Sequence, residues 1–315
     1  MTLVRHGGNL EGVTALIDVS AVVRRPAGVV RVSGPARLTY LHAMLSQHLH
    51  EAPEGTVADF LYLDPKGNAQ AEGRAVVRAA DVLLVTAPEV AAELAASLER
   101  LHFLMEASAA DISADWGLAS VRGPSVSVPG APEAPMTAVA DGAGLLIRDR
   151  SGGVDLLGET GWLTPRVADL GLPLAGEAEW EAWRIGAGLP AWGREIVPGR
   201  RPQELGLLPT HVHLRKGCYP GQESIAKVHN LGKPRRALAV LELAGEVSPG
   251  DPVELPEGGR PGEVTSAADE GEAWVALALV PLTADGTPSD TVTVGGEPAH
   301  LRHMVGAGLD QPGAD

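Results

Sequence analysis

The segment Lys216-Gly217-Cys218-Tyr219-Pro220-Gly221-Gln222-Glu223 places an amine, a thiol, a phenol, an amide and a carboxylate within eight residues. It also contains the only cysteine of the chain. A helix or a strand gains nothing from such a mixture, whereas glycine allows left-handed backbone and the close approach of a ligand. The proline before Gln222 indicates a turn that leads into a new helix. The segment therefore predicts a shaped loop that presents side chains, and such loops carry function more often than packing.

Cys218 is the candidate nucleophile of this loop, because Lys216 and a helix that starts at Gln222 would both favour the thiolate. A lone cysteine is also commonly a small buried hydrophobe. Its role as attacking thiolate, metal contact or one-carbon acceptor stays open. Glu223 and Gln222 either cap the helix or take part in chemistry, with Glu223 orienting Lys216 or accepting a proton. Lys216 is the natural contact for an anion, and Tyr219 serves either packing or stacking.

Positive charge gathers around this loop in a chain that is acidic as a whole. The formal net charge of −15 disfavours nonspecific binding of nucleic acid by the whole molecule. Between residues 200 and 236, however, eight lysines and arginines stand against two glutamates, a local charge of +6. This basic region is either a solvated surface or a site for an anionic ligand. Direct binding of tRNA through it is the weakest of the functional hypotheses.

The composition is that of an ordinary soluble globular protein, with 44% hydrophobic and 21% charged residues. A chain of 315 residues is long enough for two or three subdomains. One cysteine excludes an intramolecular disulfide and cannot alone supply four thiolates to an iron–sulfur cluster. No apolar stretch approaches the roughly 18 residues needed to span a bilayer, and no signal peptide is evident. We therefore expect a cytoplasmic protein without a membrane segment.

Patterns of helix and strand alternate through the first two thirds of the chain. The expected strands are 29–33, 60–63, 75–78, 82–86, 144–148 and 154–157, and the expected helices are 38–49, 89–106 and 177–187. Asp64-Pro65-Lys66-Gly67 predicts a turn between two of these strands. This alternation predicts mixed α/β layers.

The pattern changes after Pro234. Alternating segments at 238–243, 252–255, 262–266, 273–280 and 291–294, separated by Gly, Pro and Asp, predict a small antiparallel barrel. We expect two α+β lobes over residues 1–234, with a junction near 124–140, where proline and small residues concentrate. The barrel would span 235–305, and 306–315 would form a disordered tail.

The eight-residue segment resembles the signature of the YgfZ family of folate-binding proteins. These are relatives of the glycine-cleavage T protein, a tetrahydrofolate-dependent aminomethyltransferase. Weaker matches follow in the same order along the chain, at Asp18-Val19-Ser20, 32–35, 64–67, 184–190, 202–204 and 262–266. The resemblance implies an α+β, three-lobed T-protein-like fold, with two α+β lobes and a C-terminal antiparallel β-barrel around a central opening.

The same resemblance implies that tetrahydrofolate binds in the central opening. It assigns the pterin's amino-pyrimidine edge to Glu195, since a carboxylate accepts two N–H donors side by side. It assigns a stacking contact to Trp180, whose alternative is a core position on a helix. Arg184 belongs to the segment that lines the pocket, and Tyr219 would add a stacking surface. Cys218 would lie at the mouth of the pocket, and the basic region would hold the glutamate tail of the folate.

One departure from the T protein bears on the chemistry. The paired aspartates that follow its glycine turn align with Ala71 and Glu72 here. A longer side chain moves the carboxylate, and catalysis depends on placing groups within fractions of an ångström. The resemblance therefore implies an accessory protein that supports assembly or repair of iron–sulfur enzymes, including tRNA-modifying ones. The alternative is a folate-dependent aminomethyltransferase or demethylase that uses Glu72 as its acid–base group.

His211 and His213 are expected to alternate on a strand and so to share a face, near Cys218 and His229. Two histidines and a thiolate are a ligand set for zinc. Their spacing matches no standard zinc module, so we expect a histidine pair packed beside the loop and no bound metal.

Overall fold

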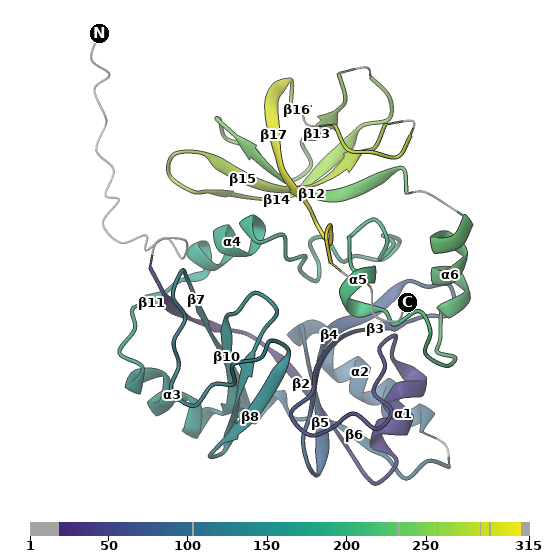
Figure 1. The fold of residues 1–315 in the computed structure, drawn as a ribbon, viewed down its shortest axis with the longest axis vertical. Coiled ribbons are helices and arrows are strands. Elements are labelled where there is room, and N and C mark those ends of the chain that lie inside the picture. Colours follow the sequence, from purple (N-terminus) through teal and green to yellow (C-terminus); the bar gives the residue numbers. More distant parts are fainter. Residues whose placement is uncertain are drawn as a thin grey trace.

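A computed structural model of the chain describes residues 19–102, 104–231, 234–256, 258–283, 285–289 and 291–309, with only the backbone at 228–231. Two sheets lie side by side below a β-barrel, and the helices α4 (Glu177–Gly186) and α5 (Leu208–His211) lie between the sheets and the barrel (Figure 1). The expected architecture of two α+β lobes and a C-terminal antiparallel barrel is confirmed. Asp18, part of the resemblance, falls outside the described residues.

The first lobe is a five-stranded sheet in the order β3-β4-β5-β2-β6 with two helices on one face. Its elements are β2 (Gly28–Ser33), α1 (Arg37–Met44), β3 (Val57–Leu63), β4 (Ala69–Val77), β5 (Asp81–Thr86), α2 (Pro88–Leu101) and β6 (Ser108–Asp111). Side chains of a strand point alternately to the two faces. Val30 and Val32 accordingly join the core under the helices, whereas Val29 faces the second lobe.

The second lobe is a six-stranded sheet in the order β11-β1-β7-β10-β9-β8. Its elements are β1 (Ala21–Arg25), β7 (Trp116–Arg122), β8 (Thr137–Asp141), β9 (Gly144–Arg148), β10 (Val154–Glu159), α3 (Thr160–Asp169) and β11 (Leu174–Ala175). The chain crosses between the sheets after β1 and again at η1 (Ser113–Asp115). The segment 124–135, which we expected near a junction, is a loop within this sheet. Val29 and Leu83 pack against Leu118 and Leu157 across the lobes, so the two sheets share a core.

The barrel is closed, in the order β12-β15-β14-β13-β16-β17. Its strands are β12 (Arg236–Leu243), β13 (Pro252–Glu254), β14 (Gly262–Asp269), β15 (Trp274–Pro281), β16 (Thr291–Val294) and β17 (Glu297–Met304). Sequence patterns missed β17, because only Ala299 on this strand is fully buried and the remaining positions are largely polar. Of the expected tail, 306–309 form a turn in which Gly306 lies against Gly206, and 310–315 lie outside the described residues.

Three helices connect the lobes to the barrel: α4 (Glu177–Gly186), α5 (Leu208–His211) and α6 (Gln222–Leu231) (Figure 1). Two helices are shorter than expected. α1 ends at Met44 because Ser46 hydrogen-bonds Leu61 of β3, and α2 ends at Leu101 because the chain returns to pair Ser108 with Ser33. In the described part of the chain, no helix is long and apolar enough to cross a membrane.

Candidate functional site

Charged side chains from both lobes form a network of alternating sign that joins the two sheets, here called the central cluster. In the order in which they contact one another, its members are Arg150, Asp59, Arg74, Asp155, Arg122 and Asp149. The link between the lobes is the ion pair from Arg74 Nη1 on β4 to Asp155 Oδ2 on β10, at 2.8 Å. Arg122 Nη2 contacts an oxygen of Asp155 and an oxygen of Asp149, each at 2.7 Å.

Asp155 is the hub of the central cluster and is almost fully buried. Its Oδ1 accepts hydrogen bonds from Ser120 Oγ at 2.7 Å and from Arg122, and its Oδ2 accepts one from Arg74. Burial alone would raise the pKa of this carboxyl, but the guanidiniums of Arg122, Arg74 and Arg25 hold it well below its usual range. Asp155 is therefore a buried carboxylate that stays ionised.

Glu72, the expected acid–base group, forms an ion pair with His211 beside the central cluster. His211 Nε2 lies 3.1 Å from Glu72 Oε1, and its Nδ1 lies 2.6 Å from Thr210 Oγ1. The Thr210 hydroxyl donates to the carbonyl of Leu207, so it accepts from Nδ1. Both ring nitrogens then donate, which is the imidazolium form. Burial opposes that charge, but the bond to Glu72 and the charge of Asp59 raise the pKa of His211.

Two indole rings lie at the edge of the central cluster. Trp180 and Trp183 of α4 have ring centres 5.1 Å apart. The Cζ atom of Arg25 lies 3.8 Å from the centre of the Trp180 ring, and that of Arg122 lies 5.1 Å from Trp183. Trp180 is buried and Trp183 is half-buried. Aromatic faces of this kind accept both cations and flat heterocycles.

A second polar region surrounds residues 216–221, here called the thiol loop. Cys218 is exposed. Lys216 is buried, and its ammonium donates to the carbonyls of His42 and Leu45 at the end of α1. A cation at that position satisfies the last carbonyls of the helix. Burial, partly opposed by the nearby Cys218, lowers the pKa of Lys216 to about 8.

Lys216 therefore holds the thiol loop against α1, and its contact with an anion stays a prediction. Tyr219 is buried as well, and Lys216 Nζ lies 4.6 Å from the centre of its ring. Its ring belongs to the core between β3 and the barrel, which favours the packing role over stacking. The helix expected at Gln222 begins there, and Glu223 in its first turn is exposed.

Two glycines allow the thiol loop to lie against the turn between β3 and β4. Gly221 has φ +80°, and a Cβ there would lie 2.6 Å from the carbonyl oxygen of Asp64. A Cβ on Gly67 would similarly lie 2.7 Å from Ser224 Cβ. Any other residue at Gly221 would push these segments apart. The expected turn at 64–67 therefore packs directly against the thiol loop.

Four histidines lie beside the thiol loop: His42, His48, His50 and His213. Their ring centres are 4.7 Å apart for His42 and His48, 5.8 Å for His42 and His50, and 5.2 Å for His48 and His213. Burial and the charge of Lys216 lower the pKa of His42 to about 4, and burial and His48 lower that of His213. Within the described residues, no group of three or more His, Cys, Asp or Glu side chains is arranged to hold a metal ion.

The prediction that His211 and His213 share one face of a strand is wrong. His211 is the last residue of α5, and the chain then extends so that His213 N donates to the carbonyl of Ser46. As a result, His211 faces Glu72 and His213 faces His48. The two histidines belong to the two different polar regions.

Glu195 and Arg184, both expected at the pterin, instead join α4 to the barrel. Glu195 is fully buried, and its carboxylate accepts from Arg184 Nη1 at 3.1 Å, Ser266 Oγ at 2.6 Å and Ala191 N at 2.9 Å. Arg184 also donates to Glu181. Burial opposes the charge of Arg184, but the bonds to Glu181 and Glu195 raise its pKa. In this conformation Arg184, Ser266 and the backbone of Ala191 occupy the carboxylate of Glu195, and its contact with the pterin stays a prediction.

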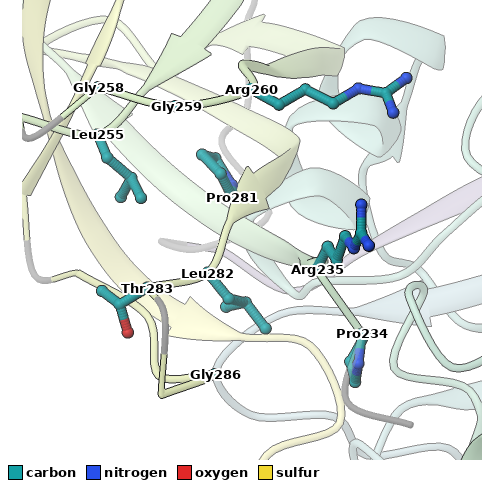
Figure 2. A pocket seen from close by; sticks show the side chains of 10 residues that line it. All are labelled: Pro234, Arg235, Leu255, Gly258, Gly259, Arg260, Pro281, Leu282, Thr283 and Gly286. Carbon is teal, nitrogen blue, oxygen red and sulfur yellow. The ribbon is translucent and has the colours of Figure 1, made fainter.

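A hollow of about 490 Å³ lies at the edge of the barrel, away from both polar regions. Figure 2 shows its wall, which includes Arg235 and Arg260 beside Leu255 and Leu282. No carboxylate, histidine or thiol is among the described residues that line it. It therefore lacks groups for acid–base or nucleophilic chemistry.

Sequence reasoning missed the central cluster. Its residues are scattered over strands and turns of both lobes, with no local spacing to reveal them. The signal that was present is a charge inside an otherwise apolar strand, as with Asp155 in β10 and Arg122 at the end of β7. A charge at such a position needs a partner.

No protein-family model matches the chain. A curated protein of Arabidopsis thaliana named "putative transferase, chloroplastic" is 27% identical over 299 residues, which cover 85% of this chain and 66% of that protein. The chain thus spans about two thirds of the length of this relative.

Two solved structures are also similar. The glycine cleavage system aminomethyltransferase T from Bartonella henselae superposes with a TM-score of 0.78 at 17% identity, over 95% of this chain and 89% of that chain. A heterotetrameric sarcosine oxidase from Corynebacterium sp. U-96 reaches a TM-score of 0.36 at 15% identity, over 47% of this chain and 80% of that chain. The first match shows that the chain has the T-protein fold.

Proposed function

We propose that this protein binds tetrahydrofolate at the central cluster and supports assembly or repair of iron–sulfur enzymes in the cytoplasm, including enzymes that modify tRNA. The observation that carries the proposal is the exposure of Cys218, the only thiol of the chain, on a loop whose neighbours are fixed. Lys216 anchors one side of that loop and Gly221 the other. A thiol held this firmly at the surface fits a chemical or partner-contacting role better than a packing role.

The central cluster has the chemistry that a folate requires. The half-buried indole of Trp183 suits a flat heterocycle, whereas Arg25 already lies on the buried ring of Trp180, and Glu72 is 27% exposed beside His211. Bound tetrahydrofolate would supply a carrier for one-carbon units. The resemblance of residues 216–223 to the folate-binding YgfZ signature supports the same ligand, and so does the shared T-protein fold.

A folate-dependent aminomethyltransferase or demethylase is the second candidate, and the partial exposure of Glu72 favours it. Against it, Oε1 of Glu72 is engaged by His211, so only Oε2 would be left to remove a proton. Turnover of a methylamine donor with tetrahydrofolate, reduced at least a hundredfold in Glu72→Ala, would establish the enzyme. Absence of turnover in the wild type would exclude it.

The test of the proposed function is Cys218→Ala. We expect iron–sulfur enzyme activity in cells that rely on this variant to fall to the level without the protein. The affinity for tetrahydrofolate in calorimetric titration should stay within about twofold, because Cys218 lies outside the central cluster. The free energy of unfolding should change by less than about 0.5 kcal/mol, as for other exposed positions. Ser224→Ala on α6 is the matched control. Full enzyme activity with Cys218→Ala, or no folate binding by the wild type, would overturn the proposal.

A further inference from the structure

Positive charge exceeds negative charge at the edge of the central cluster. The six members of the cluster are three arginines and three aspartates, so their charges cancel. Glu72 and the imidazolium of His211 cancel as well. Arg25 stands outside both sets, and in the described part of the chain no carboxylate forms an ion pair with it. One guanidinium is therefore left without a counterion.

The surroundings of Arg25 make this surplus costly. Arg25 is the last residue of β1, and its Nη1 donates to Ser120 Oγ at 3.3 Å while its planar group lies on Trp180. Asp155 and Glu72 are the acids whose charges act on Arg25, but the oxygens of Asp155 already accept from Ser120, Arg122 and Arg74, and Glu72 is paired with His211. Burial, opposed by Asp155 and reinforced by Arg122 and Arg74, lowers the pKa of Arg25 to about 10. A desolvated cation without a partner is unfavourable unless something else supplies the negative charge.

We infer that Arg25 is the anchor for a carboxylate of the ligand in the central cluster. A guanidinium stacked on an indole keeps its in-plane N–H donors available, and those donors match the two oxygens of a carboxylate. This inference rests on the proposed function, and the carboxylate is then one of the two on the glutamate tail of tetrahydrofolate. The tail would therefore lie against β1 and Trp180.

This assignment moves the tail away from the basic region at 200–236. Two of the arginines there are already paired, since Arg200 contacts Glu263 at 2.8 Å and Arg236 contacts Glu204 at 3.4 Å. Lys216 bonds backbone carbonyls beneath the thiol loop. Three of the eight positive side chains in that stretch are thus engaged within the protein, whereas no carboxylate of the described residues forms an ion pair with Arg25.

The test is calorimetric titration of Arg25→Gln with tetrahydrofolate and with its dimethyl ester, in which both tail carboxylates are neutral. We expect the variant to bind tetrahydrofolate about ten- to a hundredfold more weakly, the effect of one charge-assisted hydrogen-bonded contact. The ester should bind the wild type and the variant equally. Arg25→Lys should restore part of the affinity. Arg24→Gln is the matched control, because Arg24 is the exposed neighbour on the same strand.

Three results would count against the inference. Equal affinity of the wild type and Arg25→Gln for tetrahydrofolate would overturn it and leave the proposed function standing. If Arg25→Gln lost affinity for tetrahydrofolate and for its ester by the same factor, the inference would also be overturned, because the loss would not depend on the carboxylates. If the wild type does not bind tetrahydrofolate, the proposed function fails. The carboxylate anchor is then tested separately, by thermal melting with N-(4-aminobenzoyl)glutamate. Stabilisation of the wild type and Arg24→Gln but not of Arg25→Gln would support a carboxylate anchor, and equal behaviour of all three would overturn it.

Discussion

The central cluster and the thiol loop both contain buried charged side chains, but the partners that stabilise those charges differ. In the central cluster each buried charge meets an opposite charge, and Asp155 serves two arginines and a hydroxyl at once. In the thiol loop the buried ammonium of Lys216 meets neutral carbonyls, and its charge helps to lower the pKa of the neighbouring His42. The first arrangement joins two lobes, and the second holds a short loop in shape while its thiol remains exposed. Substitutions should therefore damage stability in the central cluster far more than in the thiol loop.

The largest effect is expected for Asp155→Asn. The amide keeps the shape of the side chain but removes the anion that Arg74 and Arg122 share, leaving each with one aspartate, and breaking such buried ion pairs typically lowers the free energy of unfolding by about 3–5 kcal/mol. Urea unfolding measures this loss. Asp169→Asn is the control, because Asp169 is exposed at the end of α3, and its change should stay below about 0.5 kcal/mol. Equal losses for the two variants would show that the central cluster does not hold the lobes together.

A smaller effect is expected for Lys216→Met. The methionine fills most of the volume but leaves the carbonyls of His42 and Leu45 without their donor, which should lower the free energy of unfolding by about 1–3 kcal/mol. The backbone amides of the loosened thiol loop should also exchange their hydrogens with solvent faster. Lys66→Met, at an exposed position of the turn between β3 and β4, should change neither quantity. An unchanged rate of amide hydrogen exchange in Lys216→Met would mean that the ammonium does not fix the thiol loop.

The same contrast explains what the sequence could predict. The thiol loop is continuous in the chain, so its glycines, its thiol and the helix at Gln222 could be recognised together. The turn at 64–67 and five of the six barrel strands also carry strong local patterns. These features depend on neighbours in sequence, and local patterns report them well.

The central cluster depends on contacts that no local pattern encodes. Asp59 and Asp155 are 96 positions apart by their numbers, and they meet through Arg74 only because two separate sheets pack face to face. The hydrogen bonds of Glu195 to Arg184 and Ser266 are also long-range contacts that the local sequence does not encode. His211 and His213 differ because a single helical turn ends between them. Each of these outcomes follows from tertiary packing.

The smallest effect is expected from a change of pH. The pKa of His211, beside the central cluster, and that of His42, beside the thiol loop, are shifted in opposite directions. The pKa of His211 is raised, so its contribution to stability is complete below the unfolded value of about 6.5 and is lost as pH rises through the folded value. The pKa of His42 is lowered to about 4, so its contribution is complete above about 6.5 and is lost as pH falls through 4. Between pH 4 and 6.5 the wild type should therefore lose more stability on acidification than His42→Asn. Above pH 6.5 it should lose more on alkalinisation than His211→Asn. NMR titration of the two imidazoles gives the direct check, and a common pKa would mean that the two regions do not differ in charge environment as their geometry indicates.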